Sequence, residues 1–348
     1  MPPDAAGYGR GVSDLRTLLD GRAAETGFSG VVRVDGPDGT LVEAAYGLAE
    51  RAHRIPMRTD TQLGIASGSK AFTALVVMSL VEQSALALDT PARAVLGKDL
   101  PLIGPNVTVE HLLAHRSGIG DYLDEDVLTD AAAYVLAVSP HRLVRTEDFL
   151  PILAGFPAKF PAGSGFRYCN GGYVVLALIA ERVSGTGYHD LVRQRVCGPA
   201  DMVDTDFLRL DALPGRAATG YVHVDGQWRS NVLHLPVLAT GDGGIHTTAA
   251  DLHRFWQALF AGRIVAATTV QQMLQPRSVT ESGQYRYGLG FWLPGTGPQV
   301  HLEGEDAGVS FRSRHDPQAG LTWTVIANGA EGAWPVAELL RDWAADPG

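Results

Sequence analysis

Residues 64–83, GIASGSKAFTALVVMSLVEQ, place a serine, Ser67, three residues before a lysine, Lys70. Of the 28 Lys and Arg residues in the chain, only Lys70, Lys98 and Lys159 are lysines. The chain therefore uses arginine for ordinary positive charge. Arginine stays protonated in proteins, whereas lysine can lose its proton when it is removed from water. A rare lysine beside a serine indicates a hydroxyl nucleophile with a basic partner.

The segment 67–84 is expected to form a long apolar helix that begins at Ser67. The free N–H groups and the positive end of the helix dipole stabilise negative charge at that position. Lys70 lies about one turn further on, so its amine can reach the Ser67 hydroxyl. Burial lowers the pKa of a lysine toward the neutral form, which can act as a base.

A second pair of chemically useful side chains occurs in FRYCN, residues 166–170. Tyr168 could act as a phenolate base, if Lys70 holds it in that state, or as a proton shuttle. Asn170 could position a substrate carbonyl or the lysine. Cys169, between them, is expected to pack in the core.

The motifs Ser67-x-x-Lys70 and Tyr168-x-Asn170 resemble the class C β-lactamase-like or penicillin-binding-protein-like serine hydrolases, a family that includes esterases and D-amino-acid peptidases. The resemblance covers residues 10–345 and also rests on the segments 111–122, 160–185, 198–207 and 241–255. It implies that Ser67 is a nucleophile that forms an acyl-enzyme. It further implies that Lys70 and Tyr168 transfer protons and that Asn170 supports them.

The resemblance also implies an α+β fold of the β-lactamase/transpeptidase type, with an antiparallel sheet flanked by terminal helices and an all-α insertion. We expect residues 1–95 and 215–348 to form the sheet domain, residues 96–214 to form the insert, and the active site to lie between them. The sequence pattern agrees with this layout. It predicts a hairpin around 36–39, strands at 287–293, 308–315 and 321–328, and helices at 13–26 (N-cap Ser13), 67–84, 109–115, 146–155, 171–185 (C-cap glycine), 250–262 (capping box of Thr248 with Asp251) and 333–345.

The third family motif, a basic residue on a strand beside the site, departs from the family pattern. With the chain aligned on Gly304, Leu302 takes the place of the basic residue and His301 stands one position early. One position reverses the face of a strand, so His301 should point away unless a bulge corrects it. The resemblance places the oxyanion hole at the N–H groups of Ser67 and Glu305.

The altered motif affects which substrates can bind, because Glu303, Glu305 and Asp306 are expected to bring negative charge to the site. Like charges disfavour carboxylate-bearing ligands such as β-lactams, unless Arg312 or Arg167 compensates. We therefore expect an esterase or amidase acting on small acyl substrates that are uncharged or carry an amine.

The composition of the chain limits its expected partners, cofactors and location. The net charge is −10 and no basic run occurs, so we expect no nucleic-acid partner. No apolar run has membrane-spanning length and no signal peptide is recognisable, so we expect a cytoplasmic protein. Cys169 and Cys197 are expected to be reduced thiols. No cofactor or metal is expected, and the oligomeric state is left open.

Several alternatives share part of this pattern. A β-lactamase, a D-amino-acid peptidase and an acyltransferase would use the same catalytic groups, and a catalytically silent binding protein could retain them. His111 and His115 have the spacing of two zinc ligands on one helix face, but HLLAH lacks the glutamate of H-E-x-x-H. Ser67 lacks the flanking glycines of a G-x-S-x-G nucleophile, which excludes an α/β-hydrolase elbow.

Overall fold

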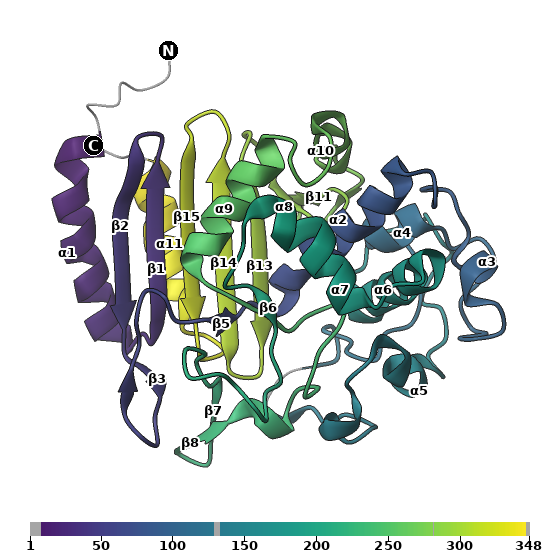
Figure 1. Ribbon diagram of the computed structural model, residues 1–348, viewed down its shortest axis with the longest axis horizontal. Coiled ribbons are helices and arrows are strands. Elements are labelled where there is room, and N and C mark those ends of the chain that lie inside the picture. The colour runs from purple at the N-terminus through teal and green to yellow at the C-terminus, as the bar shows by residue number, and fades with distance from the viewer. Residues whose placement is uncertain (1–7, 129–132, 281, 346–348) are drawn as a thin grey trace.

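An eight-stranded antiparallel sheet forms the centre of the computed structural model, which describes residues 8–128, 133–280 and 282–345. The strand order is β10-β11-β12-β13-β14-β15-β1-β2, so the first and last parts of the chain share one sheet (Figure 1). Its strands are β1 (Gly30–Gly36), β2 (Gly39–Tyr46), β10 (Ser278–Val279), β11 (Tyr285–Tyr287), β12 (Trp292–Pro294), β13 (Val300–Asp306), β14 (Val309–Asp316) and β15 (Leu321–Ala327).

Helices cover both faces of this sheet. The terminal helices α1 (Tyr8–Thr26) and α11 (Ala333–Ala345) pack together on one face, and α9 (Ala249–Phe260) lies on the other (Figure 1). Neighbouring residues of β1 alternate between the two layers: Val32 joins the cluster of α1 and α11, whereas Val31 joins the core that contains α9. The apolar run of β1 follows from this double burial.

Beside the sheet lies α2 (Ser69–Glu82), which packs against the helical segments of residues 170–197 (Figure 1). Every residue of α2 from Ser69 to Leu80 is buried, which explains why its sequence is apolar all round. Its neighbours include α6 (Asn170–Ser184). The other helices between residues 92 and 200 are α3 (Ala92–Leu96), α4 (Val109–Leu113), α5 (Leu150–Leu153), α7 (Tyr188–Val192) and α8 (Gly198–Ala200).

Short elements connect the layers. A three-stranded sheet of order β5-β9-β6 lies next to the serine segment. The remaining elements are β3 (Leu48–Glu50), β4 (Ile55–Pro56), β5 (Leu63–Gly64), β6 (Asp206–Phe207), β7 (Tyr221–Val224), β8 (Gln227–Ser230), β9 (Ile245–Thr247), α10 (Ala267–Met273), the 3₁₀ turns η1 (Ala66–Gly68), η3 (Pro140–Arg142), η4 (Thr146–Phe149) and η6 (Asn231–Leu233), and the π-helical η5 (Arg193–Cys197).

The structure confirms the predicted fold class and corrects three local predictions. The first helix begins at Tyr8, so Ser13 lies inside it and is not the N-cap. The predicted strand 287–293 is two strands, β11 and β12, because Gly290 has φ +90° and the chain turns there. Thr248 accepts a hydrogen bond from Asp251 N, but the Asp251 carboxylate binds Asp204 N instead of completing the box. The division at residues 95 and 215 stays a prediction.

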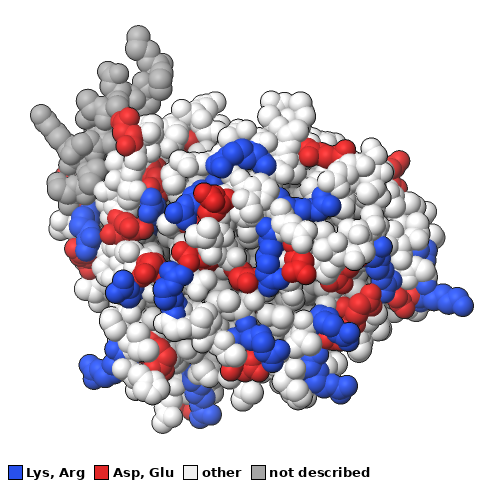
Figure 2. Space-filling model, viewed as in Figure 1, with Lys and Arg blue, Asp and Glu red and all other residues white. Residues whose placement is uncertain are grey.

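Charged side chains are interspersed by sign on the face of the molecule in Figure 2. Cys169 and Cys197 are buried free thiols, as predicted. Within the part of the chain that the structure describes, no helix has the length and apolar character needed to cross a membrane.

The cap of α9 gives a stability test. Thr248→Ala removes the hydroxyl that binds Asp251 N at 3.1 Å. We expect the free energy of unfolding to fall by about 1 kcal/mol, the usual value of an N-cap. Urea unfolding measures the loss, and Thr248→Ser, which keeps the hydroxyl, should restore most of it. Equal losses in both variants would contradict the capping role.

Candidate active site

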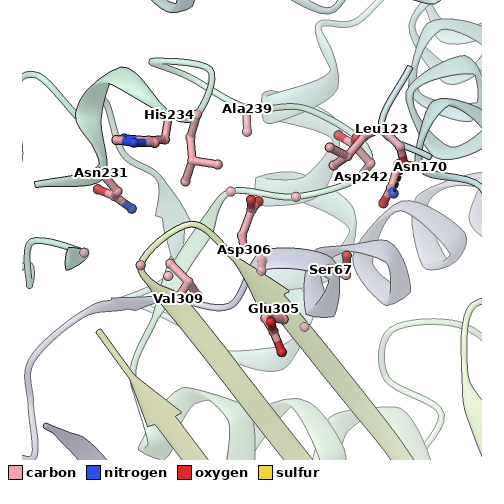
Figure 3. Close-up of a pocket in the computed structure, with 18 of the residues that line it drawn as sticks. Ser67, Leu123, Asn170, Asn231, His234, Ala239, Asp242, Glu305, Asp306 and Val309 are labelled. Carbon is pink, nitrogen blue, oxygen red and sulfur yellow. Dashed lines mark hydrogen bonds between the residues drawn. The ribbon is translucent and has the colours of Figure 1, made fainter. Parts of the chain in front are cut away.

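Ser67 occupies a strained turn that leads into α2. It lies in η1, between β5 and the first residue of α2. The preceding residue, Ala66, has φ +44°, an unusual value for a residue with a side chain. Strain of this kind is stored at functional sites when the surroundings fix the turn. Here the turn brings the half-buried Ser67 side chain to the surface of a pocket (Figure 3).

Lys70 lies under the serine with three polar neighbours. Its Nζ is 2.8 Å from Ser67 Oγ, 2.7 Å from Asn170 Oδ1 and 2.8 Å from the carbonyl oxygen of Asp242. The last two atoms can only accept hydrogen bonds, whereas a hydroxyl can also donate. A neutral amine with two N–H groups and one lone pair fits this arrangement, with the lone pair toward the Ser67 proton.

The surroundings of Lys70 favour the neutral form. Burial lowers the pKa of Lys70, and the carboxylates of Asp242 and Glu125 oppose that shift. The net direction is downward, because the ammonium loses its hydration inside the apolar helix layer. The lowered pKa agrees with the expectation that this position needs a lysine, which can lose its proton, rather than an arginine.

Tyr168 completes the group around the nucleophile. It lines the same pocket as Ser67, and its ring centre lies 4.9 Å from Lys70 Nζ. The ring is held between His115, at 4.3 Å, and Trp292, at 5.9 Å between ring centres. Burial, with the nearby Glu125 carboxylate, raises the pKa of Tyr168 well above its ordinary value. Of the two predicted roles, this direction favours the proton shuttle over the phenolate base.

Asn170 is fixed by hydrogen bonds at both ends of its amide. Its Oδ1 accepts from Lys70, and its Nδ2 donates to Leu123 O at 2.9 Å and to Glu125 Oε1 at 3.1 Å. The backbone is fixed as well, because the Asp121 carboxylate accepts from the N–H of Asn170 at 2.6 Å. Asp121 thereby caps α6. Helix α6 sets the positions of both the amide and the lysine.

Strand β13 passes directly beside the serine turn. A Cβ atom on Gly304 would lie 2.6 Å from Ser67 N and 2.9 Å from Gly68 N. A glycine is therefore required for this close approach. The position of Glu305, next along the strand, agrees with the predicted oxyanion hole between two backbone N–H groups.

His301 and Leu302 lie as the strand alternation predicts. β13 pairs with β14 without a register shift from Val300 to Asp306, so no bulge returns His301 to the face of Leu302. Leu302 is buried in the apolar core, and His301 lies behind Trp292 with its ring stacked at 6.3 Å. Burial lowers the pKa of His301 well below its ordinary value. His301 does not line the pocket that contains Ser67.

The pocket has a volume of about 560 Å³ and joins these groups (Figure 3). Sequence reasoning missed three of its important residues. Asp242 supplies a carbonyl to Lys70, Glu125 orients Asn170, and Trp292 stacks on Tyr168. Asp242 lies inside the segment 241–255 that carried the family resemblance, but one carboxylate among 38 Asp and Glu residues gives no individual signal.

The geometry removes the basis of the zinc alternative. His111 belongs to α4 and accepts from Thr108 N, whereas His115 lies beyond the helix with φ +55° and accepts from Cys169 N. The two rings therefore do not share one helix face. The described residues contain no group of three His, Cys, Asp or Glu side chains that could hold a metal ion.

The sequence matches the Beta-lactamase family over residues 15–345, and the chain belongs to that family. It is 30% identical over 297 residues to a D-aminopeptidase of Cereibacter sphaeroides (83% of this chain, 53% of the relative). It is 35% identical over 222 residues to the esterase EstB of Burkholderia gladioli (61% of this chain, 55% of the relative). The chain thus spans about half the length of these curated relatives.

A comparison with solved structures leads to the same family and fold. The penicillin-binding protein from Bacillus halodurans superimposes with a TM-score of 0.87 at 35% identity, covering 93% of this chain and 99% of that protein. The predicted family and fold are confirmed. The roles of individual residues stay predictions.

The contact at Gly304 gives the first test of the site. Gly304→Ala should displace the turn at Ser67 and lower the rate of reaction with a fluorophosphonate by roughly 100-fold, the usual effect of losing one oxyanion donor. Gly329→Ala is the matched control, because a Cβ at Gly329 meets no atom within 4 Å. Intact-mass kinetics measure both rates, and equal rates would contradict the contact.

The state of Lys70 gives the second test. Because its pKa is lowered, the neutral base should form below the ordinary lysine value of about 10.5. The rate of phosphonate labelling should therefore rise with pH and level off before that value. Lys70→Met should lower the plateau rate by roughly 100-fold or more, the usual contribution of a general base. A wild-type rate that is flat with pH and unchanged in Lys70→Met would exclude Lys70 as the base.

Proposed function

We propose that this protein is a serine hydrolase that forms an acyl-enzyme at Ser67 and cleaves small ester or amide substrates. The observation that carries the proposal is the arrangement around Lys70 Nζ, 2.8 Å from Ser67 Oγ with its other two polar neighbours limited to accepting. Nucleophile and base thus meet at one oxygen atom, and a second proton carrier, Tyr168, lies beside them with its ring centre 4.9 Å from Lys70 Nζ.

In the acylation step, neutral Lys70 takes the Ser67 proton while Oγ forms a bond to the substrate carbonyl carbon. The N–H groups of Ser67 and Glu305 stabilise the oxyanion that develops. Tyr168, protonated at rest, gives its proton to the leaving oxygen or nitrogen as that bond breaks, and Lys70 restores the proton to Tyr168. Water then attacks the acyl-enzyme, releasing a carboxylic acid and returning Ser67 to its hydroxyl form.

The charge of the pocket supports a restricted substrate class. Among the described residues, five carboxylates line it against one guanidinium, that of Arg312: they belong to Glu125, Asp242, Glu303, Glu305 and Asp306. Arg312 already binds Glu303 at 2.6 Å, and Arg167 binds Asp126 outside the pocket lining. Both arginines are thus already paired with a carboxylate of the protein, which weakens their attraction for a substrate carboxylate. Substrates without a carboxylate, such as neutral esters and amine-bearing amides, fit these charges best.

A substrate panel tests this proposal. Wild type should cleave short-chain 4-nitrophenyl esters with a higher kcat/KM than a cephalosporin, and Ser67→Ala should cleave neither. Product analysis with and without an added alcohol separates hydrolysis from acyl transfer. A cephalosporin turned over more efficiently than the esters would contradict the proposed substrate class. A cytoplasmic location stays a prediction from the sequence, which cell fractionation would test.

A further inference from the structure

Asp306, the last residue of β13, projects into the pocket close to the nucleophile. In Figure 3 its carboxylate lies between Ser67 and the pair Asn231 and His234. The side chain is half-buried, and its accessible surface faces the pocket. Neither the proton transfers nor the oxyanion hole described above uses this carboxylate.

The strand geometry sets which part of a substrate meets Asp306. Gly304 is level with Ser67, because its Cβ position is 2.6 Å from Ser67 N. Residues two apart on a strand face the same side, so Asp306 projects toward the side of the serine turn, about 7 Å further along. Glu303, which precedes Gly304, lies next to Arg312 instead. Glu303 and Asp306 therefore lie on opposite faces of β13.

Asp306 differs from the other four carboxylates of the pocket in its partners. Each of those accepts a hydrogen bond from another side chain: Glu303 from Arg312, Glu305 from Trp334 Nε1, Asp242 from Tyr122 and Glu125 from Asn170. Across the described chain, the Asp306 carboxylate accepts only from its neighbour Ala307 N, at 3.0 Å. Its second oxygen thus remains available to a ligand. Burial raises the pKa of Asp306 to about 7, as expected for a carboxylate without a cationic partner.

The pocket also has an apolar part of its lining, here called the apolar wall. It consists of Leu208, Leu210, Leu235, Pro236 and Val309. A hydrocarbon group can fill this part of the pocket, but a second carboxylate cannot, because it would face Asp306 without a compensating cation. An ammonium group is the ligand that both neutralises the carboxylate and supplies the missing donors.

We propose that Asp306 is a specificity-determining residue that binds a protonated amine on the α or β carbon of the substrate's acyl group. This assignment rests on the proposed function of Ser67 and adds the chemistry of the acyl group. The substrates favoured would be esters or amides of amino acids, with the amine at Asp306 and the side chain against the apolar wall.

Three 4-nitroanilides test the assignment: alanyl, β-alanyl and propionyl, with alanine supplied as each enantiomer. Wild type should have a higher kcat/KM for at least one amine-bearing substrate than for the propionyl compound, which lacks only the amine. Asp306→Asn, of nearly the same shape, should reduce that preference by roughly 10-fold or more, the usual strength of a charged hydrogen bond. Glu303→Gln is the matched control, because it neutralises another carboxylate of the pocket. In this variant the ratio of kcat/KM between the amine-bearing and propionyl substrates should stay at the wild-type value.

Labelling with an uncharged fluorophosphonate separates the two proposals. Asp306→Asn should still form the Ser67 adduct, which shows a folded protein with a competent Ser67. An unchanged preference in Asp306→Asn, or no preference in a wild type that labels, would overturn the amine assignment and leave the serine hydrolase standing. A wild type that does not label would overturn the proposed function, and the amine assignment with it.

Discussion

The rest of the site depends on the removal of one amine, that of Lys70, from water, which lowers its pKa. Lys70 lies at the start of a helix in which every residue from Ser69 to Leu80 is buried, so its charged form has lost its hydration. The two acceptors that replace that hydration come from distant parts of the chain, Asn170 on α6 and the backbone at Asp242. The fold therefore brings three segments together at one nitrogen atom. A shift of any of them would leave a buried amine without its partners, at a cost of roughly 1–3 kcal/mol.

Both the sheet and the helices hold Ser67 and Lys70 in position. The close approach of Gly304 to the Ser67 turn fixes the serine against β13, and the packing of α2 on α6 fixes the lysine against Asn170. Of the two predicted oxyanion-hole N–H groups, that of Glu305 thus belongs to the sheet, whereas that of Ser67 belongs to the same segment as Lys70. Interiors are packed closely enough to hold such positions to a few tenths of an ångström. The Asp121 carboxylate strengthens the arrangement, because it holds the first residues of α6.

The sequence predicted this site where residue type and local spacing determine contact. Ser67 and Lys70 meet because they lie three residues apart at a helix start, and the last helix has the predicted bounds, 333–345. Asp242 and Trp292 could not be found in this way, because their contacts with Lys70 and Tyr168 join residues more than 100 positions apart. The error at 287–293 has a similar origin: the apolar pattern continues through Gly290, and only the backbone turn there separates the two strands. The alternation at His301 and Leu302 was predictable, since a strand without a bulge has a fixed period of two.

The central claim is that Ser67 is a nucleophile activated by its neighbours. Its most direct test is the intact mass of the protein after exposure to a fluorophosphonate, with Ser67→Ala as the comparison. The account predicts a single adduct on wild type and none on the variant. An unlabelled but folded wild-type protein would contradict the account and would indicate that the altered third motif has removed the chemistry from this site.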